Sequence, residues 1–292
     1  MVAAVLLVGG IFWAGERRVP AGGAEGATLN GAIAAASRTP GSFRVGSFNI
    51  HSGKGVDRQR DIARTADCLR DMDLVALNEV IGSTPWRDWN QSQQLGEALA
   101  CQWLFAPTES RWWHGSFGNG LLTRLPAYYW QRIPFNLAGS HTHRNLVLTA
   151  VDVDGARVNV VLTHLDSRDL DRRQNQLRAA GELFLSLAEP AILMGDLNSR
   201  ANDEQLRRIL DAPGVIDALS TGGASSDPGR IDWILTRGLK VVTSGATDTA
   251  PRTIRLSGPS WKSPARRQAI RRGPCPSHST RSAELRMHCS GP

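Results

Sequence analysis

Residues 192–199, ILMGDLNS, combine a short apolar run with two polar side chains directly after it. The run at residues 191–194 predicts a buried strand. Because side chains alternate across a strand, Asp196 and Asn198 should point the same way, while Leu197 points into the core. A carboxylate and an amide oxygen side by side suit a hard divalent cation, or a water that must be held and deprotonated. The same residue types also form turns, so this stretch alone leaves both interpretations open.

Other segments repeat this arrangement of one polar group at the end of an apolar strand. The groups and their segments are Asn49 (43–50), Glu79 (74–80), His164 (157–164) and Asp232 (230–235). A carboxylate buried in such a run costs several kcal/mol unless it meets a cation or strong donors, although an edge strand would let it reach solvent. A lone His is usually structural, but one at the mouth of a buried strand is a catalytic candidate. The recurrence predicts a site assembled across the lip of a sheet sandwich.

The remaining pattern predicts a mixed α/β (α+β) domain. Residues 144–152 and 157–163 indicate a hairpin that turns at Asp154-Gly155, residues 239–244 continue a sheet, and residues 253–257 lead out of it. Aromatic side chains in residues 102–122 suit core packing, stacking on a base, or a lipid interface, and the pattern does not choose among these. Helical spacing occurs in residues 58–72, 93–100, 171–187 and 203–211.

Charge is concentrated at the C-terminal end of the chain. The 292 residues have a formal net charge of +7 and a pI of about 9.9. Residues 258–292 hold seven Lys and Arg and one acid, a net +6, so residues 1–257 carry only +1. A near-neutral body argues against a non-specific DNA nuclease, which usually has a cationic groove. The four cysteines show no CxxC spacing and so predict no thiolate metal centre.

The N-terminal residues 1–42 predict an export signal or membrane anchor followed by a linker. Residues 2–15 are apolar and uncharged, shorter than the ~20 residues of a membrane span. No basic residue precedes the run and Arg17 and Arg18 follow it, which is atypical, and a start codon assigned too far downstream would explain both features. We expect the folded domain, residues 43–257, to be exported or membrane-anchored in a bacterium, on the periplasmic side or secreted.

Six motifs, taken together and in order, carry a family resemblance. They are SFNIHSG (47–53), ALNEV (76–80), GNGLLTR (118–124), LTHLDSR (162–168), GDLNS (195–199) and RIDWIL (230–235). From about residue 44 to residue 257 the chain resembles the endonuclease/exonuclease/phosphatase superfamily, which includes DNase I-like nucleases, inositol polyphosphate 5-phosphatases and bacterial sphingomyelinases. The resemblance implies a DNase I-like fold, a four-layer sandwich of two packed mixed β-sheets flanked by helices.

The resemblance also implies a metal and phosphate site. Glu79 would be the principal Mg²⁺ ligand, assisted by the amide oxygen of Asn49, with Mn²⁺ as an alternative ion. The metal would neutralise phosphate charge and stabilise the leaving oxygen. Asn119 and Arg144 would support the phosphate-binding site.

Four further residues receive catalytic roles from the resemblance. Asp196 would orient or deprotonate the attacking water, and Asn198 would hold a phosphoryl oxygen. His164 would donate a hydrogen bond to the phosphate. Asp232 would pair with a later His and hold that imidazole protonated beside the developing negative charge.

The sequence departs from the family at its last motif, Ser-Asp-His. After Ser257 the chain reads Gly-Pro-Ser, and no Asp-His follows. One interpretation is a genuine disordered basic extension at residues 258–292. The other is a single-base insertion at the Ser257–Gly258 junction, because GGA-CCA-TCN becomes GAC-CAT, Asp-His, when one G is removed. A frameshifted product would lack its last core strand and the His that pairs with Asp232, which would impair it.

Three hypotheses about function follow. The first is a Mg²⁺-dependent phosphoesterase, a monomer that acts on a phosphodiester in nucleic acid or in a phospholipid head group, the latter favoured by a membrane tether. The second is an inactive pseudoenzyme that binds phosphorylated ligands or serves as a scaffold. The third is that the basic tail binds nucleic acid.

Overall fold

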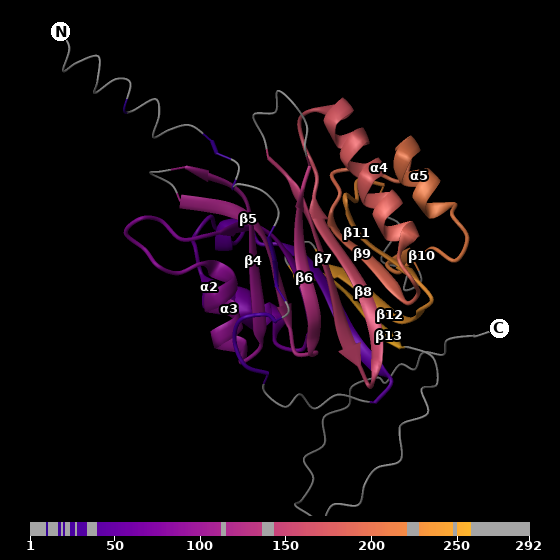
Figure 1. Cartoon of the computed structure of the whole chain (residues 1–292), viewed down its shortest axis with the longest axis horizontal. Coiled ribbons are helices and arrows are strands. Elements are labelled where there is room, and N and C mark those ends of the chain that lie inside the picture. The colour runs from indigo at the N-terminus through magenta and orange to yellow at the C-terminus, as the bar shows by residue number, and fades with distance from the viewer. Residues whose placement is uncertain are drawn as a thin grey trace, which may run out of the picture.

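Two mixed β-sheets pack face to face, and two α-helices cover the outer face of each (Figure 1). This confirms the predicted four-layer sandwich. The computed structural model describes residues 10, 17–18, 20, 24–26, 28–33, 40–111, 115–135, 143–220, 228–247 and 250–257.

The larger sheet has seven strands. They are β1 (Ala24–Gly26), β6 (Ala127–Pro134), β7 (Asn145–Val153), β8 (Ala156–His164), β9 (Ala191–Asp196), β10 (Ile216–Asp217) and β11 (Asp232–Arg237). Their order is β1-β6-β7-β8-β9-β11-β10, and β8 and β9 form the parallel pair. All six residues of β9 are buried, because neighbours on both sides and packed layers on both faces exclude water. The predicted hairpin is present as β7 and β8, with its turn at Asp154 and Gly155.

The smaller sheet has six strands. They are β2 (Ser42–Asn49), β3 (Leu74–Ile81), β4 (Gln102–Arg111), β5 (Gly115–Thr123), β12 (Lys240–Thr247) and β13 (Ala250–Ser257). Their order is β12-β13-β2-β3-β5-β4, with β2 parallel to β3. Since β2 and β3 run parallel, their carboxyl ends reach the same edge of the sheet.

Each outer layer of helices covers one sheet. The helices are α2 (Ile62–Leu69) and α3 (Gln91–Leu99) on the smaller sheet, α4 (Leu170–Ser186) and α5 (Glu204–Leu210) on the larger one, and the short η1 (His51–Gly53) after β2. An Asp or Asn side chain caps each α-helix by accepting N–H groups of its first turn. The caps are Asp61, Asn90, Asp169 and Asp203.

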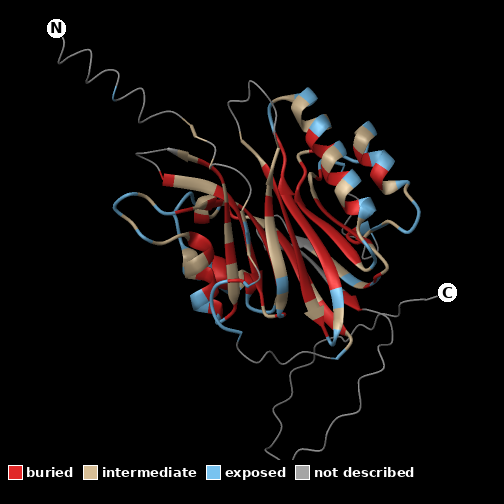
Figure 2. Ribbon diagram, in the orientation of Figure 1, coloured by how far each residue is buried: buried red, intermediate tan, exposed pale blue. Residues whose placement is uncertain are grey.

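The main hydrophobic core lies between the two sheets, where Figure 2 shows long buried stretches in the central strands. In this core, Val45 and Leu121 of the smaller sheet pack in one cluster with Val160 and Met194 of the larger sheet. Each sheet also has one hydrophobic cluster between it and its own helices. The polar residues at the strand ends lie at the border of this core, as the pattern of a polar group after each apolar run predicted.

Described parts of the N-terminal segment pair with both sheets. β1 pairs with β6, Arg18 bridges to Ser110 of β4, and Asn30 bridges to Trp103 of the same strand. These contacts cover strand edges that would otherwise expose unpaired backbone groups. Among the described helices, none is long and apolar enough to cross a membrane. The predicted apolar run at residues 2–15 lies outside the described residues except for Gly10.

The prediction that residues 253–257 lead out of the sheet is wrong. They belong to β13, which lies between β12 and β2 and satisfies the backbone groups of β2 on that side. Ser257 pairs with Ser42, at the opposite end of β2 from Asn49. The tail predicted at residues 258–292 lies outside the described residues.

Gly195 allows β9 to approach β8 closely just before Asp196. Its φ is +137°, and a Cβ at this position would lie 1.9 Å from the carbonyl oxygen of Thr163. Neither the backbone angle nor the space admits a larger residue. The glycine before the candidate carboxylate is therefore required by packing.

Replacing Gly195 with Ala should destabilise the protein far more than replacing Gly155. Both have positive φ, but a Cβ at Gly155 would meet nothing within 4 Å. We expect Gly155→Ala to cost about 1–2 kcal/mol from the backbone alone, and Gly195→Ala on the order of 4 kcal/mol or more, or to prevent folding. Urea unfolding of the two variants measures the difference. Equal losses would contradict the packing argument.

Candidate functional site

Three polar side chains come together where β8, β9 and β11 meet the sheet edge. In the strand registers, His164 of β8 is the partner of Asp196 of β9, and Asp196 is also the partner of Asp232 of β11. The His164 Nε2 and Asp196 Oδ2 atoms are 3.7 Å apart. The parallel β8–β9 pair and the antiparallel return of β11 thus bring together three residues that the sequence singled out separately.

The smaller sheet supplies Asn49 and Glu79 at the same edge. Asn49 ends β2, and its strand partner is Asn78 on β3. Glu79 follows at a bulge, marked by a register shift between Leu77 and Val80 and by a φ of +58° at Glu79 itself. A bulge redirects a side chain that regular alternation would point elsewhere. Positive φ is uncommon outside glycine, and such positions cluster at functional sites.

The Asn49 carboxamide joins the carboxylates of the two sheets. Its Nδ2 donates to Oε1 of Glu79 at 3.0 Å and to Oδ2 of Asp196 at 3.2 Å, and its Oδ1 accepts the backbone N–H of His51. Two carboxylates thus converge on one amide group. The predicted metal ligands and the predicted base lie in direct contact.

Beneath this contact lies a buried network of asparagine side chains. Asn78 is fully buried, and its Nδ2 donates to Oδ1 of Asn119 at 2.9 Å and to the Thr163 carbonyl at 3.2 Å. Its Oδ1 accepts the backbone N–H of Asp196 at 3.0 Å. Asn119 donates in turn to Oδ1 of Asn145. Asn119 is therefore placed to support Asp196 through Asn78, and its predicted phosphate contact stays a prediction.

Burial and like charge raise the pKa of Asp196. Removal from water disfavours its ionised form, and the nearby charge of Asp232 adds to this effect. Donors oppose the shift, namely the backbone N–H of Asn198 and the Asn49 amide. The resulting pKa is about 6. A carboxylate with this pKa is ionised at neutral pH and is more basic than an ordinary one, as a general base requires.

His164 is neutral at physiological pH. Its side chain is 6% exposed, and burial together with the nearby charge of Arg144 lowers its pKa to about 3. It can therefore hydrogen-bond a phosphate but does not carry positive charge. Arg144 supplies the cation. Burial lowers the pKa of Arg144, while neighbouring carboxylates, Asp166 first, raise it. Its Nε has no hydrogen-bond partner among the residues that the structure describes.

Glu79 remains ionised because of the donors around it. Burial raises its pKa, but hydrogen bonds from His51 and Asn49 outweigh burial and bring it to about 2. His51 Nδ1 lies 3.5 Å from Oε2 of Glu79, and this contact raises the pKa of His51 despite partial desolvation. The sequence interpretation missed His51 as a site residue, although it follows Asn49 by two positions within SFNIHSG.

Asn198 turns back toward β8. Its φ is +48°, so strand alternation does not place its side chain, although Leu197 is fully buried as predicted. The Nδ2 of Asn198 donates to the Leu165 carbonyl at 3.0 Å, and its backbone N–H donates to Oδ1 of Asp196. Its predicted contact with a phosphoryl oxygen stays a prediction.

The donor set suits a hard cation held by few protein ligands. No group of three or more His, Cys, Asp or Glu that could hold a metal occurs in the described parts of the chain. The carboxylates of Glu79 and Asp196 nevertheless face one position, which the Asn49 NH₂ group now bridges. Mg²⁺ commonly takes one or two carboxylates and completes its shell with water and phosphate oxygens, so these residues fit it. The Asn49 amide would have to turn its oxygen toward the carboxylates.

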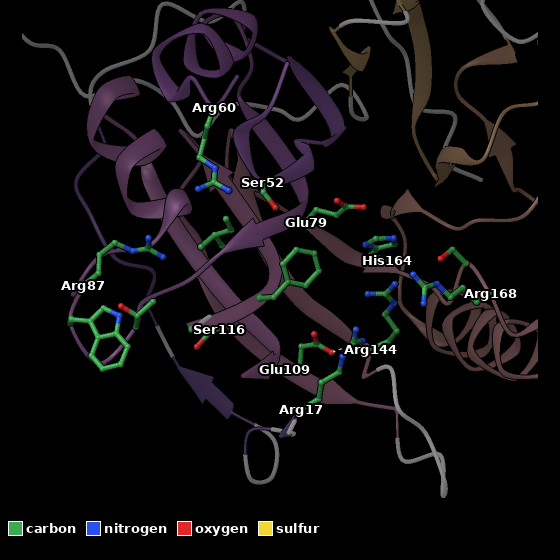
Figure 3. A pocket seen from close by; sticks show the side chains of 16 residues that line it. Arg17, Ser52, Arg60, Glu79, Arg87, Glu109, Ser116, Arg144, His164 and Arg168 are labelled. Atoms are coloured by element: carbon green, nitrogen blue, oxygen red, sulfur yellow. Dashed lines mark hydrogen bonds and ion pairs between the residues drawn. The ribbon is translucent and has the colours of Figure 1, made fainter. Parts of the chain in front are cut away.

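A cleft of about 700 Å³ opens beside this site, and its described lining includes Glu79, Arg144 and His164 (Figure 3). Its described lining contains five arginines but two glutamates, so the cleft is cationic although residues 1–257 carry only +1. This local concentration removes the objection that a near-neutral body raised against polyanionic substrates. The charged lining residues are Arg17, Arg60, Glu79, Arg87, Glu109, Arg144 and Arg168.

Comparison with known proteins identifies the family. The profile of the Endonuclease/Exonuclease/phosphatase family matches residues 46–263. The chain belongs to this family. Its members are metal-dependent phosphoesterases, and the strand ends described above lie within the matched region. No protein of curated function matches the chain.

Several solved structures share the fold. An endonuclease/exonuclease/phosphatase from Beutenbergia cavernae is 21% identical with a TM-score of 0.62, covering 75% of this chain and 72% of that one. A mannosyl-6-phosphatase from Bacteroides thetaiotaomicron is 14% identical with a TM-score of 0.56, covering 74% and 98%. The human Nocturnin catalytic domain is 16% identical with a TM-score of 0.57, covering 74% and 93%. At these identities the likeness concerns the fold alone.

Replacing Asp196 with Asn should stabilise the metal-free protein at neutral pH. Since folding raises the pKa of Asp196 from 3.8 to about 6, its ionisation opposes folding. The penalty is absent below about pH 4, grows between pH 4 and 6, and is complete above pH 6. The uncharged amide of the Asp196→Asn variant would avoid this penalty, a gain of up to about 3 kcal/mol. Urea unfolding in EDTA at pH 4 and pH 7.5 tests this.

The matched control for this prediction is Asp71→Asn, because the Asp71 side chain is 78% exposed. It should change stability by less than about 0.5 kcal/mol at either pH. A gain from Asp196→Asn that is the same at both pH values would show that ionisation is not its cause.

Replacing Asn78 with Asp should destabilise the fold although the two side chains have the same shape. The substitution removes the donors to Asn119 and the Thr163 carbonyl and places an acceptor against acceptors. We expect a loss of about 2–5 kcal/mol. Asn175→Asp, at an exposed position of α4, is the control. Equal midpoints in urea for both variants would contradict the assigned role of Asn78.

Proposed function

We propose that this protein is a Mg²⁺-dependent phosphodiesterase, with Mn²⁺ as an alternative ion. The observation that carries the proposal is the contact between Glu79 and Asp196 through the Asn49 amide, beside a cationic cleft that Glu79 helps to line. Ionised carboxylates from different sheets converge there beside an arginine and a neutral histidine. This arrangement matches the needs of phosphate-ester hydrolysis, in which the negative charge of the phosphate must be bound while water attacks its phosphorus atom.

Glu79 and Asn49 would hold the cation, which when bound neutralises phosphate charge and stabilises the leaving oxygen. Asp196 would take a proton from the attacking water, since its pKa of about 6 leaves it ionised and basic at neutral pH. The negative charge of Asp232 maintains this basicity.

The other side chains would bind the phosphate. Arg144 lines the cleft beside His164 and brings a guanidinium that suits phosphate oxygens. His164 would donate one hydrogen bond in its neutral form. Asn198, fixed against the Leu165 carbonyl, would orient a phosphoryl oxygen.

The substrate we propose is a phosphodiester in nucleic acid or in a phospholipid head group. Arginines along the cleft support an extended anionic substrate. We further propose that the protein is a monomer and that residues 1–42 export or tether it in a bacterium, which would bring phospholipids within reach.

The alternative is an inactive relative that binds phosphorylated ligands or serves as a scaffold. The Asp-His that the resemblance implies does not follow Ser257 in the sequence, so the His expected from the resemblance is not supplied there. Loss of one member of such a site costs on the order of 10²–10⁴ in rate. We propose that activity is reduced to this extent in the chain as written.

Hydrolysis of bis(p-nitrophenyl) phosphate, with Mg²⁺ and with EDTA, tests the proposal. We expect Mg²⁺-dependent release of nitrophenol, which Glu79→Gln lowers on the order of 10²-fold or more because the main cation ligand is lost. Glu182→Gln, exposed on α4, is the matched control and should retain the full rate. A version with one G deleted from codon 258 should be faster if the insertion hypothesis holds.

Each other outcome has a defined meaning. Hydrolysis that survives both EDTA and Glu79→Gln would contradict the proposed metal site. Folded protein that binds Mg²⁺ and phosphate but turns over no diester, in either reading frame, would identify the inactive alternative.

A further inference from the structure

The cleft extends well beyond the residues that the proposed reaction uses. Figure 3 shows Arg168 and His164 at one end and Arg87 at the other, with Arg60 pointing inward between them. We call the part of the cleft lined by Arg60, Trp86 and Arg87 the distal arm. The proposed reaction uses none of these residues, so their chemistry needs a separate explanation.

The distal arm carries positive charge that no described carboxylate neutralises. Neither Arg60 nor Arg87 lies within 4 Å of a carboxylate in the described part of the chain. The glutamates of the cleft already have partners. Glu79 contacts His51 and Asn49, and Glu109 forms an ion pair with Arg17 at 3.4 Å. Two arginines in one cleft with no described carboxylate beside them form a site for an anion, which guanidinium groups bind through several hydrogen bonds at once.

Arg87 is held in place before any ligand arrives. One of its terminal N–H groups donates to the Gly82 carbonyl at 3.2 Å, and its guanidinium lies 4.3 Å from the centre of the Trp89 ring. A cation stacked on an aromatic ring and hydrogen-bonded at one corner loses little freedom on binding.

A buried side chain joins the two helices that flank the loops of the distal arm. Arg60 lies in the segment between η1 and α2, whereas Trp86 and Arg87 lie between β3 and α3. Gln91, 1% exposed, donates to the Ser52 carbonyl at 2.7 Å and accepts the Ile81 N–H at 2.8 Å. This link fixes α3, which follows one loop, against η1, which precedes the other, and against the strand that carries Glu79.

Trp86 adds an aromatic surface to this arm. Its side chain is 62% exposed, which is high for a residue of this size. A large exposed ring beside arginines offers a flat group, such as a base, a face on which to stack.

We propose that the distal arm is a second anion-binding subsite. It takes a phosphate of the substrate that is not hydrolysed, bound by Arg60 and Arg87, while the scissile phosphate lies at Glu79 and His164. The preferred substrates are therefore phosphodiesters that carry a second phosphate, and Trp86 favours those in which a nucleobase accompanies it. This inference rests on the proposed hydrolysis for its kinetic test but not for its binding test.

The kinetic test compares thymidine 5′-(p-nitrophenyl phosphate) with and without a 3′-phosphate. We expect the second phosphate to raise kcat/KM at least about tenfold. Arg60→Ala and Arg87→Ala should bring this ratio close to one and change the rate with the singly phosphorylated substrate less than about threefold. Arg178→Ala, exposed on α4, should leave the ratio intact. A preference that survives both cleft variants, or is absent from the wild-type enzyme, overturns the subsite.

A second pair of substrates tests whether the second phosphate belongs to a nucleotide or to an inositol head group. Glycerophosphoinositol with and without a 4-phosphate offers the second anion without a base. Trp86→Ala should lower kcat/KM for the thymidine substrates and leave kcat/KM for the inositol substrates unchanged. An equal effect on both pairs would show that Trp86 does not stack on a base.

Calorimetric binding separates failure of the subsite from failure of the proposed function. Thymidine 3′,5′-bisphosphate should bind at least about tenfold more tightly than thymidine 5′-phosphate, and the difference should disappear in Arg60→Ala and Arg87→Ala. This difference without turnover would refute the hydrolase and keep the subsite. Turnover without this difference would refute the subsite and keep the hydrolase. Matching unfolding midpoints show that each variant is folded.

Discussion

One buried carboxamide, that of Asn78, fixes the two sheets against each other at the edge where the site forms. It donates across the sandwich to the Thr163 carbonyl and accepts the Asp196 N–H, while its own strand carries Glu79 one residue later. A buried amide with its hydrogen bonds satisfied is costly to displace, so the separation between the sheets cannot drift. The contact of Glu79 and Asp196 through Asn49 depends on this constraint.

At this edge the pKa values of two carboxylates are shifted in opposite directions. Donors from His51 and Asn49 lower the pKa of Glu79 to about 2, whereas burial and the charge of Asp232 raise that of Asp196 to about 6. A permanently ionised oxygen suits a cation, and a more basic one suits a water that must lose its proton. The environment rather than the residue type thus assigns each carboxylate its task.

The sequence predicted the strand ends well because a polar group that follows an apolar run is a local signal. Glu79, His164 and Asp196 were recognised in this way, Asp232 was recognised as an acid within an apolar strand, and the structure brings all four to one edge. Asn78 was not recognised, since its role depends on a strand from the other sheet and no local pattern records that partner. Residues 253–257 were misread for the same reason: their pairing with β2 joins distant segments.

The central claim, that strand ends from both sheets form one cation site, is tested most directly by Mn²⁺ titration of the full-length protein, followed by electron paramagnetic resonance. The account predicts a single class of bound ion whose affinity falls at least about tenfold in Glu79→Gln and is unchanged in Glu182→Gln. Equal Mn²⁺ affinity in the wild-type protein and in Glu79→Gln would contradict it.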